Sequence, residues 1–238
     1  MESSSVAIRV VRTVEDLKQV LDLERLVWGT DEPVPVSLLK VFAEDGGLVL
    51  LAELAGERKP VGMAVSFPGR RLDRWYLHSH MLAVLPQFRR HAVGRALKYY
   101  QLSYARDHQL AYVGWTFDPL QAKNAQFNLN VLGARATEFH RNFYGVLGDA
   151  INGAFPSHRL FVEWDGQSLK SGSGRYLAIP NNIDGLRGTD PDKALWWADR
   201  YRQKLERLMK RGYIAVGVVG KRDRSFYRLQ RAEEGRAI

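Results

Sequence analysis

One segment constrains the fold of this chain most. Over residues 82–97 an apolar strand leads into a basic turn, and the turn opens a helix at the small residues Ala92 and Gly94. Backbone N–H groups in the first turn of a helix have no partner within the helix, and the helix dipole favours an anion there. Small side chains let a ligand approach the backbone. The segment therefore predicts a cradle for a pyrophosphate group, to which its arginines add positive charge.

This turn resembles the acyl-CoA-binding motif of the GNAT superfamily of N-acyltransferases, Arg/Gln-x-x-Gly-x-Gly/Ala, at Arg89, Ala92 and Gly94. The resemblance implies that acetyl-CoA is the co-substrate and that its pyrophosphate rests on backbone N–H groups from Arg90 through Arg95. We expect Ala92, which replaces the first glycine of the motif, to take helical dihedral angles. The alternative is an ordinary strand-to-helix turn with surface arginines. The residues expected to bind the cofactor are Leu82, Val84, Arg89, Arg90, His91, Ala92, Val93, Gly94, Arg95 and Asn124.

The order of the predicted elements agrees with this resemblance. Hydrophobic periodicity predicts a strand, two helices, three strands, a helix, a strand and a helix, followed by a final core strand. This is the order of the GNAT fold, so we expect an α/β (α+β) architecture with a mixed twisted sheet flanked by helices. The expected ranges are 7–11, a helix capped by Thr13, 35–42, 47–54, 61–67, 75–84, 92–108, 111–117, 121–132 and 158–164.

The remaining residues predict an appendage. After a Gly/Ser-rich loop we expect a strand over residues 175–179, a helix from Asp190 to Arg211 and a hairpin over residues 213–229. We therefore expect a GNAT-like acyltransferase core over residues 1–165 and a C-terminal extension, residues 166–238, packed on it. The apolar side chains of the helix that should be buried against the core are Leu195, Trp196, Leu205 and Leu208.

Two histidines lie in the strand that precedes the cradle. Because residues alternate faces along a strand, we expect His78 and His80 on one face and Ser79 and Met81 on the other. A histidine can take the proton that an ammonium substrate must lose before it attacks a thioester. The resemblance implies a general base at the position of His78, where the family often has a glutamate.

Two alternatives stay open for this pair. His-x-His spacing on a strand can bind zinc, with His140 or Asp118 as a third ligand. No further ligand spacing supports that interpretation, and we expect no metal. The histidines can also be ordinary hydrogen-bonded residues of the strand.

A second candidate region follows the strand at residues 111–117. Members of the family commonly protonate the departing thiolate with a tyrosine four residues before the glycine found here as Gly133, but this chain has Leu129 there. Tyr144 is the candidate general acid in its place, and a core or loop aromatic is the alternative. Asn124 is expected near the pantetheine arm. Asp118 can hold an ammonium group, orient a base or cap the helix that follows it.

Composition excludes several classes of mechanism. The chain has no cysteine, which excludes disulfides, thiolate metal sites and an acyl-enzyme on a thiolate. No apolar run spans a bilayer and no signal peptide is visible, so we expect no membrane partner and a cytoplasmic location. The net charge of +9 is concentrated in residues 193–238, where thirteen Lys/Arg outnumber five Asp/Glu. This segment can bind nucleic acid, or it can be a solvated helix face and tail, which we favour.

These features lead us to expect an N-acyltransferase, most simply an N-acetyltransferase, that moves an acyl group from acyl-CoA to a primary amine by direct transfer in a ternary complex. The acceptor is expected to be a small-molecule or peptide amine, and the sequence does not encode its identity. The alternatives are a non-catalytic CoA-binding protein of the same fold and an acyltransferase with a nucleic-acid-associated substrate. The sequence makes no prediction of the oligomeric state.

Overall fold

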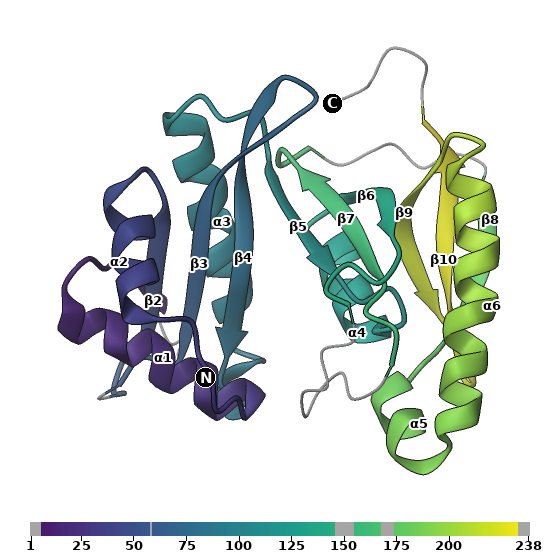
Figure 1. Cartoon of the computed structure of the whole chain (residues 1–238), viewed down its shortest axis with the longest axis horizontal. Helices are drawn as coiled ribbons and strands as arrows, with labels where there is room; N and C mark the ends of the chain where they lie inside the picture. Colours follow the sequence, from purple (N-terminus) through teal and green to yellow (C-terminus); the bar gives the residue numbers. More distant parts are fainter. Residues whose placement is uncertain (1–5, 58, 146–154, 168–173, 233–238) are drawn as a thin grey trace. The chain divides into compact units, whose positions relative to one another are not determined.

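A computed structural model of the chain describes residues 6–57, 59–145, 155–167 and 174–232 (Figure 1). The chain divides into two compact units, Met1–Gly114 and Trp115–Ile238. The boundary lies within strand β5 (Val113–Phe117), which carries the chain from the first unit into the second. The domains expected from the sequence, residues 1–165 and 166–238, were defined by sequence pattern, whereas these two units are defined by compactness. The expected division therefore stays a prediction.

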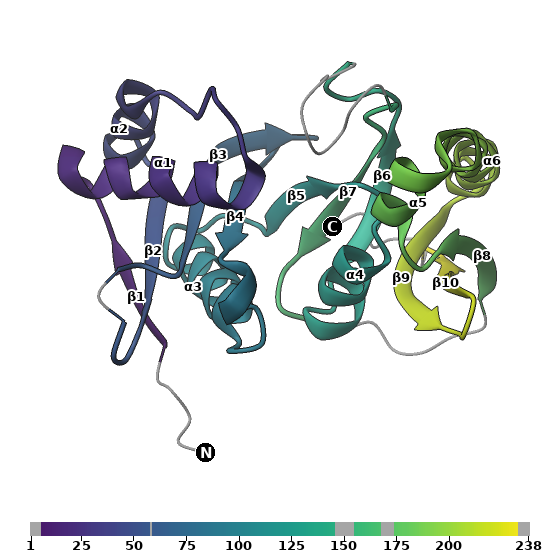
Figure 2. The same ribbon diagram turned by 90° about the horizontal axis from the view of Figure 1, so that it is seen from below.

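The first unit is a sheet with helices on both faces. Its elements are β1 (Val6–Val10), α1 (Val14–Trp28), α2 (Val36–Glu44), β2 (Leu48–Leu54), β3 (Gly62–Arg71), β4 (Arg74–Val84), η1 (Pro86–Phe88), α3 (Val93–Asp107) and the start of β5. Strands β1 to β4 pair antiparallel in chain order, and β4 pairs in parallel with β5 at Leu77–Val113 and His78–Gly114. Helices α1 and α2 lie on one face of this sheet and α3 lies on the other (Figure 2).

Helix α1 begins and ends where its sequence predicts. The hydroxyl of Thr13 accepts a hydrogen bond of 3.2 Å from the backbone N–H of Asp16, which caps the first turn. Gly29 ends the helix with a φ of 63°, a left-handed conformation that glycine adopts without strain. Local chemistry therefore explains both ends of this helix.

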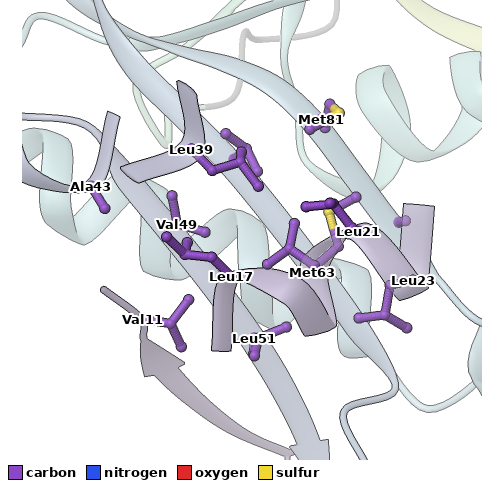
Figure 3. Packing of buried hydrophobic residues seen from close by; sticks show 13 residues of the cluster. Val11, Leu17, Leu21, Leu23, Leu39, Ala43, Val49, Leu51, Met63 and Met81 are labelled. Carbon is purple, nitrogen blue, oxygen red and sulfur yellow. The ribbon is translucent and has the colours of Figure 1, made fainter. Parts of the chain in front are cut away.

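An apolar cluster holds α1 and α2 against the sheet. Leu17 and Leu21 of α1 lie over Leu51 of β2 and Met63 of β3 (Figure 3). Met81 of β4 belongs to the same cluster. Burial of a large apolar side chain stabilises a protein by about 1.5–3 kcal/mol, so this cluster is a main source of stability for the first unit.

The second unit continues from the end of β5. Its other elements are α4 (Ala122–Ala125), the π-helical segment η2 (Gln126–Val131), β6 (Arg135–His140), β7 (Arg159–Trp164), β8 (Arg175–Pro180), α5 (Ile183–Thr189), α6 (Pro191–Met209), β9 (Tyr213–Gly220) and β10 (Arg224–Arg231). Its strands follow one another as β5, β7, β6, β9, β10 and β8. Helix α6 packs along β6, β8 and β9 (Figure 1).

The fold class agrees with the expected mixed sheet flanked by helices, but the second unit contains two elements that were not predicted, β6 and α5. Strand β6 is rich in polar residues, and its polar side chains have partners far along the chain. Arg135 donates to Asp165 at 2.9 Å, and Thr137 donates to Glu163 at 3.2 Å. The helix expected over residues 121–132 is a single α-helical turn followed by η2.

The buried stripe of α6 differs from the one predicted. Leu205 is fully buried as expected, but Leu195 is 42% exposed and Trp196 is 51% exposed. The expectation that those two side chains pack on the core is therefore wrong. The other buried residues of the helix are Ala194, Ala198 and Tyr201. A sequence shows that a helix is amphipathic, but small residues at helical spacing can line the packed face while larger ones face solvent.

The residue that leads into α3 lies in the left-handed region. Ala92 has a φ of 57° and a ψ of 10°, so the expectation of helical dihedral angles at this position is wrong. The chain turns from η1 onto the helix axis through this one residue. Glycine takes such a conformation without strain, whereas an L-residue there costs about 1–2 kcal/mol.

We therefore expect Ala92→Gly to stabilise the protein by about 0.5–1 kcal/mol, since the relieved strain exceeds the added entropy of the unfolded chain. Ala96→Gly, the same substitution inside α3, should instead destabilise by about 1 kcal/mol. Urea denaturation of both variants measures the two effects. Destabilisation of similar size in both variants would show that Ala92 carries no strain.

A second pair of variants tests the packing of α6. Leu205→Ala should destabilise the protein by about 2–5 kcal/mol, because it opens a cavity. Leu195→Ala, ten residues earlier on the same helix, should change stability by less than about 0.5 kcal/mol, because its side chain is exposed. Urea denaturation followed by circular dichroism compares them, and equal losses would contradict this assignment of the buried face.

Candidate active site

Strand β4 leads to the N-terminus of α3 through η1 and a turn. The backbone N–H of Phe88 donates to the carbonyl of Leu85, and that of His91 donates to the carbonyl of Phe88. The first helical bond runs from Ala96 to Ala92 at 2.9 Å. Across the described residues no backbone acceptor pairs with the N–H groups of Arg90, Ala92, Val93, Gly94 and Arg95. These donors are available to an anion.

The side chains around this turn are basic. Arg90, His91 and Arg95 are exposed. Arg89 is exposed as well, and its Nε donates to the carbonyl of Val84 at 3.3 Å, which ties the turn to the end of β4. The fixed positive charges and the N-terminal end of the helix dipole act in the same direction, so the electrostatics of the turn favour an anionic ligand.

The last part of β4 is paired on one edge only within the first unit. Its ladder with β5 stops at His78–Gly114, whereas its ladder with β3 continues to Val84. Leu82 is half-buried and Val84 is buried. Main-chain groups along residues 79–84 can therefore pair with an extended ligand arm, as they would with another strand.

The centre of β4 contains a β-bulge at His80. Val65 of β3 pairs with Met81, but the next residue of β3, Ser66, pairs with Ser79, so His80 is an extra residue. Ser79 contacts α3 through hydrogen bonds, while Met81 packs in the cluster beneath α1 and α2. The expectation that Ser79 and Met81 share a face of the strand is therefore wrong, because the extra residue reverses the alternation.

The structure brings the two histidines together. The ring centroids of His78 and His80 are 6.2 Å apart. Phe67 of β3 packs against both, at 5.0 Å from His78 and 5.8 Å from His80. The hydroxyl of Tyr76 lies 3.2 Å from Nδ1 of His78. Of the pair, His80 is the more exposed residue, and His78 is half-buried and held by its neighbours.

Burial sets the charge state of the pair. Removal from water lowers the pKa of His78 to about 4, and the positive charges of His80, Lys98 and Arg71 add to that effect. Burial also lowers the pKa of His80, although part of its ring remains accessible to solvent. Both imidazoles are therefore neutral at pH 7, which is the form that accepts a proton.

Sequence reasoning missed two polar residues on the buried face of α3. Lys98 is 3% exposed and Gln101 is fully buried, and both donate to the hydroxyl of Ser79. A lysine and a glutamine at inward positions of an amphipathic helix are the signal that could have identified them.

Asp118 is held by two interactions. Its carboxylate accepts a hydrogen bond of 2.9 Å from the backbone N–H of Leu120 and pairs with Arg187 at 2.6 Å. Both charged side chains of that pair are largely buried. The expectation that Asp118 caps the following helix is wrong, because the N-cap residue of α4 is Gln121 and no side chain caps it. Arg187, far along the chain, could not have been predicted as a partner.

The other candidates of the second unit lie on its surface. Tyr144 is 40% exposed, and its hydroxyl lies 3.4 Å from that of Thr116. The guanidinium of Arg159 lies over the tyrosine ring at 5.1 Å. Asn124 is exposed on α4, and Leu129, at the family's tyrosine position, is buried in η2. Tyr144 is therefore an exposed aromatic in the turn after β6, and its role as general acid stays a prediction.

Three further observations concern metal ligands, long helices and cavities. No group of three His, Asp or Glu side chains in the described ranges is arranged to hold a metal ion. Within those same ranges no helix is both long and apolar enough to cross a bilayer. A cavity of about 360 Å³ in the second unit contains none of the predicted site residues; it is lined by Leu129, Asn130, Gly133, Ala134, Arg135, Val216, Gly217, Val218, Val219 and Arg228.

Comparison with solved structures supports the fold. The ribosomal-protein-S18-alanine N-acetyltransferase of Escherichia coli matches with a TM-score of 0.53 at 16% identity, over 71% of this chain and 98% of that chain. The NatC complex bound to Gag peptide and CoA matches with a TM-score of 0.51 at 14% identity, over 70% and 99%. Chaetomium thermophilum Naa20, in complex with a bisubstrate analogue, matches with a TM-score of 0.52 at 16% identity, over 66% and 85%.

Comparison of the sequence gives a family. No curated protein matches the chain significantly. Residues 14–127 match the model of the Acetyltransferase (GNAT) family, a range that includes β4, the turn and α3. This part of the chain, just under half of its length, is therefore similar to the acetyltransferases of the GNAT family.

Proposed function

We propose that this chain is an N-acetyltransferase that moves an acetyl group from acetyl-CoA to a primary amine of a small molecule or peptide. The observation that carries the proposal is the set of unpaired backbone donors at the start of α3, flanked by exposed arginines. A pyrophosphate fits the charge and hydrogen-bonding character of this turn. The structure of NatC with CoA supports the same class of co-substrate on a similar fold.

Bound acetyl-CoA would supply an acetyl group activated as a thioester. The chain's own residues would hold and deprotonate the acceptor. Because the sequence has no cysteine, transfer would be direct and would not pass through a thiolate of the protein. Both histidines are neutral at pH 7, and His80 is the better proton acceptor of the two because it is the more exposed. His78, held by Tyr76 and Phe67, would keep the neighbouring ring in place.

The residues of the second unit keep their expected roles as part of this proposal. Tyr144 would donate a proton to the departing thiolate, which the 40% exposure of this residue supports. Asn124 would contact the pantetheine arm. Asp118 would act on the geometry of the site and not on the substrate ammonium, since Arg187 already neutralises its charge.

A non-catalytic CoA-binding protein is the second candidate. Leu129, buried where the family has its tyrosine, favours it. Acetyl transfer to a panel of amines distinguishes the candidates, because a binding protein would bind CoA without turnover.

We expect Gly94→Glu to reduce the affinity for CoA by at least about 100-fold, because it places bulk and negative charge at the phosphate position. Calorimetry measures the affinity. Ser103→Glu adds the same charge on the exposed face of α3 and should bind CoA like the unchanged protein. Equal affinity in the two variants would exclude a cradle at this turn.

We expect His80→Ala to lower kcat by roughly 10²–10⁴-fold while the affinity for CoA is unchanged. Only the neutral imidazole accepts a proton, and the pKa of His80 lies below the ordinary histidine value of 6.5. The rate should therefore fall on acidification with a midpoint below pH 6.5. His108→Ala, at the far end of α3, is the control and should retain full activity. Full activity of the His78→Ala/His80→Ala double variant would remove both residues from the mechanism, and zinc-reversible inhibition by chelators would favour a metal site.

A further inference from the structure

Four polar side chains are buried together between α3 and the sheet. Lys98 Nζ donates to Ser79 Oγ at 2.9 Å, and Gln101 Nε2 donates to the hydroxyls of Ser79 and Ser66 at 2.9 and 2.7 Å. Exposure is 3% for Lys98, 5% for Ser79 and zero for Gln101 and Ser66. Burial of a charged lysine costs free energy, and burial lowers the pKa of Lys98 well below its ordinary value. Apolar side chains would fill this space at lower cost, so the network needs a reason other than stability.

The network lies directly behind the bulge. Ser79 is the residue before His80, and it is the side chain on which Lys98 and Gln101 converge. Met81, the residue after His80, is held on the opposite face by the apolar cluster. A one-residue slip of β4 would place Ser79 in the apolar cluster or Met81 among the buried polar groups. Because Ser79 is fixed on one face of the sheet and Met81 on the other, His80 between them is the extra residue.

We propose that Lys98 is a positioning residue, which together with Gln101 holds Ser79 against α3 and so fixes the bulge that sets His80 beside His78. The claim that His80 is the base rests on the proposed function. The claim that Lys98 fixes the position of His80 rests on the structure alone. Lys98 also lies one helical turn after Gly94 on α3, so the helix that opens with the anion cradle is the one that fixes the histidine.

The first test measures histidine geometry without any activity. In the full-length protein, NMR should show His80 titrating below its ordinary pKa. Lys98→Met preserves the volume beneath α3 and removes the donor, and Ser79→Ala removes the acceptor. Each variant should raise the pKa of His80 towards 6.5, because the part of the ring that is now shielded from water becomes accessible. Leu102→Ala, on the same helix and 3% exposed, should lower the melting temperature without moving this titration. An unchanged titration in both network variants would overturn the proposal.

The second test measures turnover. Lys98→Met should lower kcat by about 10–100-fold with unchanged affinity for CoA, since a small misplacement of a reacting group has effects of that size. The Lys98→Met/Ser79→Ala double variant should lose no more than the larger single loss, because the two residues act as one unit. In a His80→Ala background, Lys98→Met should have no further effect. Additive losses would contradict a shared role. A shifted titration in a protein without acetyl transfer would refute the proposed function but leave the positioning role intact.

Discussion

Strand β4 packs against helices on both faces, and the two faces require different side chains. Towards α3 it must present Ser79 to Lys98 and Gln101, and towards α1 and α2 it must present Met81 to an apolar cluster. Two positions apart, these residues would share a face of a regular strand. The extra residue, His80, resolves this conflict, and it stands beside His78 as a result. The candidate base is thus located by packing on either side of it.

The end of the same strand carries a second departure from ideal geometry. Ala92 is left-handed where α3 begins, and the N–H groups that follow have no acceptor within the described chain. Strained backbone opposes stability, and the first N–H groups of a helix need a partner from outside the helix. Such costs cluster at functional sites, where a ligand or a reaction makes use of them. Here they occur within the region that matches the acetyltransferase family, which fits an anion-binding role for this turn.

In the second unit, side chains form hydrogen bonds with the main chain of a strand where its pairing with a neighbouring strand ends. Strand β9 pairs with β6 at a single position, Ala136–Ala215. Further along β9, the amide of Asn130 bonds both main-chain groups of Val218, at 2.7 and 2.8 Å, as a neighbouring strand would. The Asp118–Arg187 pair likewise links the residue that follows β5 to α5. Polar contacts between residues distant in sequence therefore hold the strands that follow the family-matched region.

The sequence by itself determined the elements whose signals are local. The cap of α1 at Thr13, the buried run of β2 and the strand–turn–helix around Gly94 follow from periodicity, capping and turn chemistry. Their order was enough to indicate the fold and the candidate phosphate site. Only the tertiary structure decided the bulge at His80, strand β6 and the burial of Lys98. Each of these depends on partners on other elements, such as Ser66 on β3 or Asp165 after β7, and no local pattern records which distant side chain will satisfy a buried polar group.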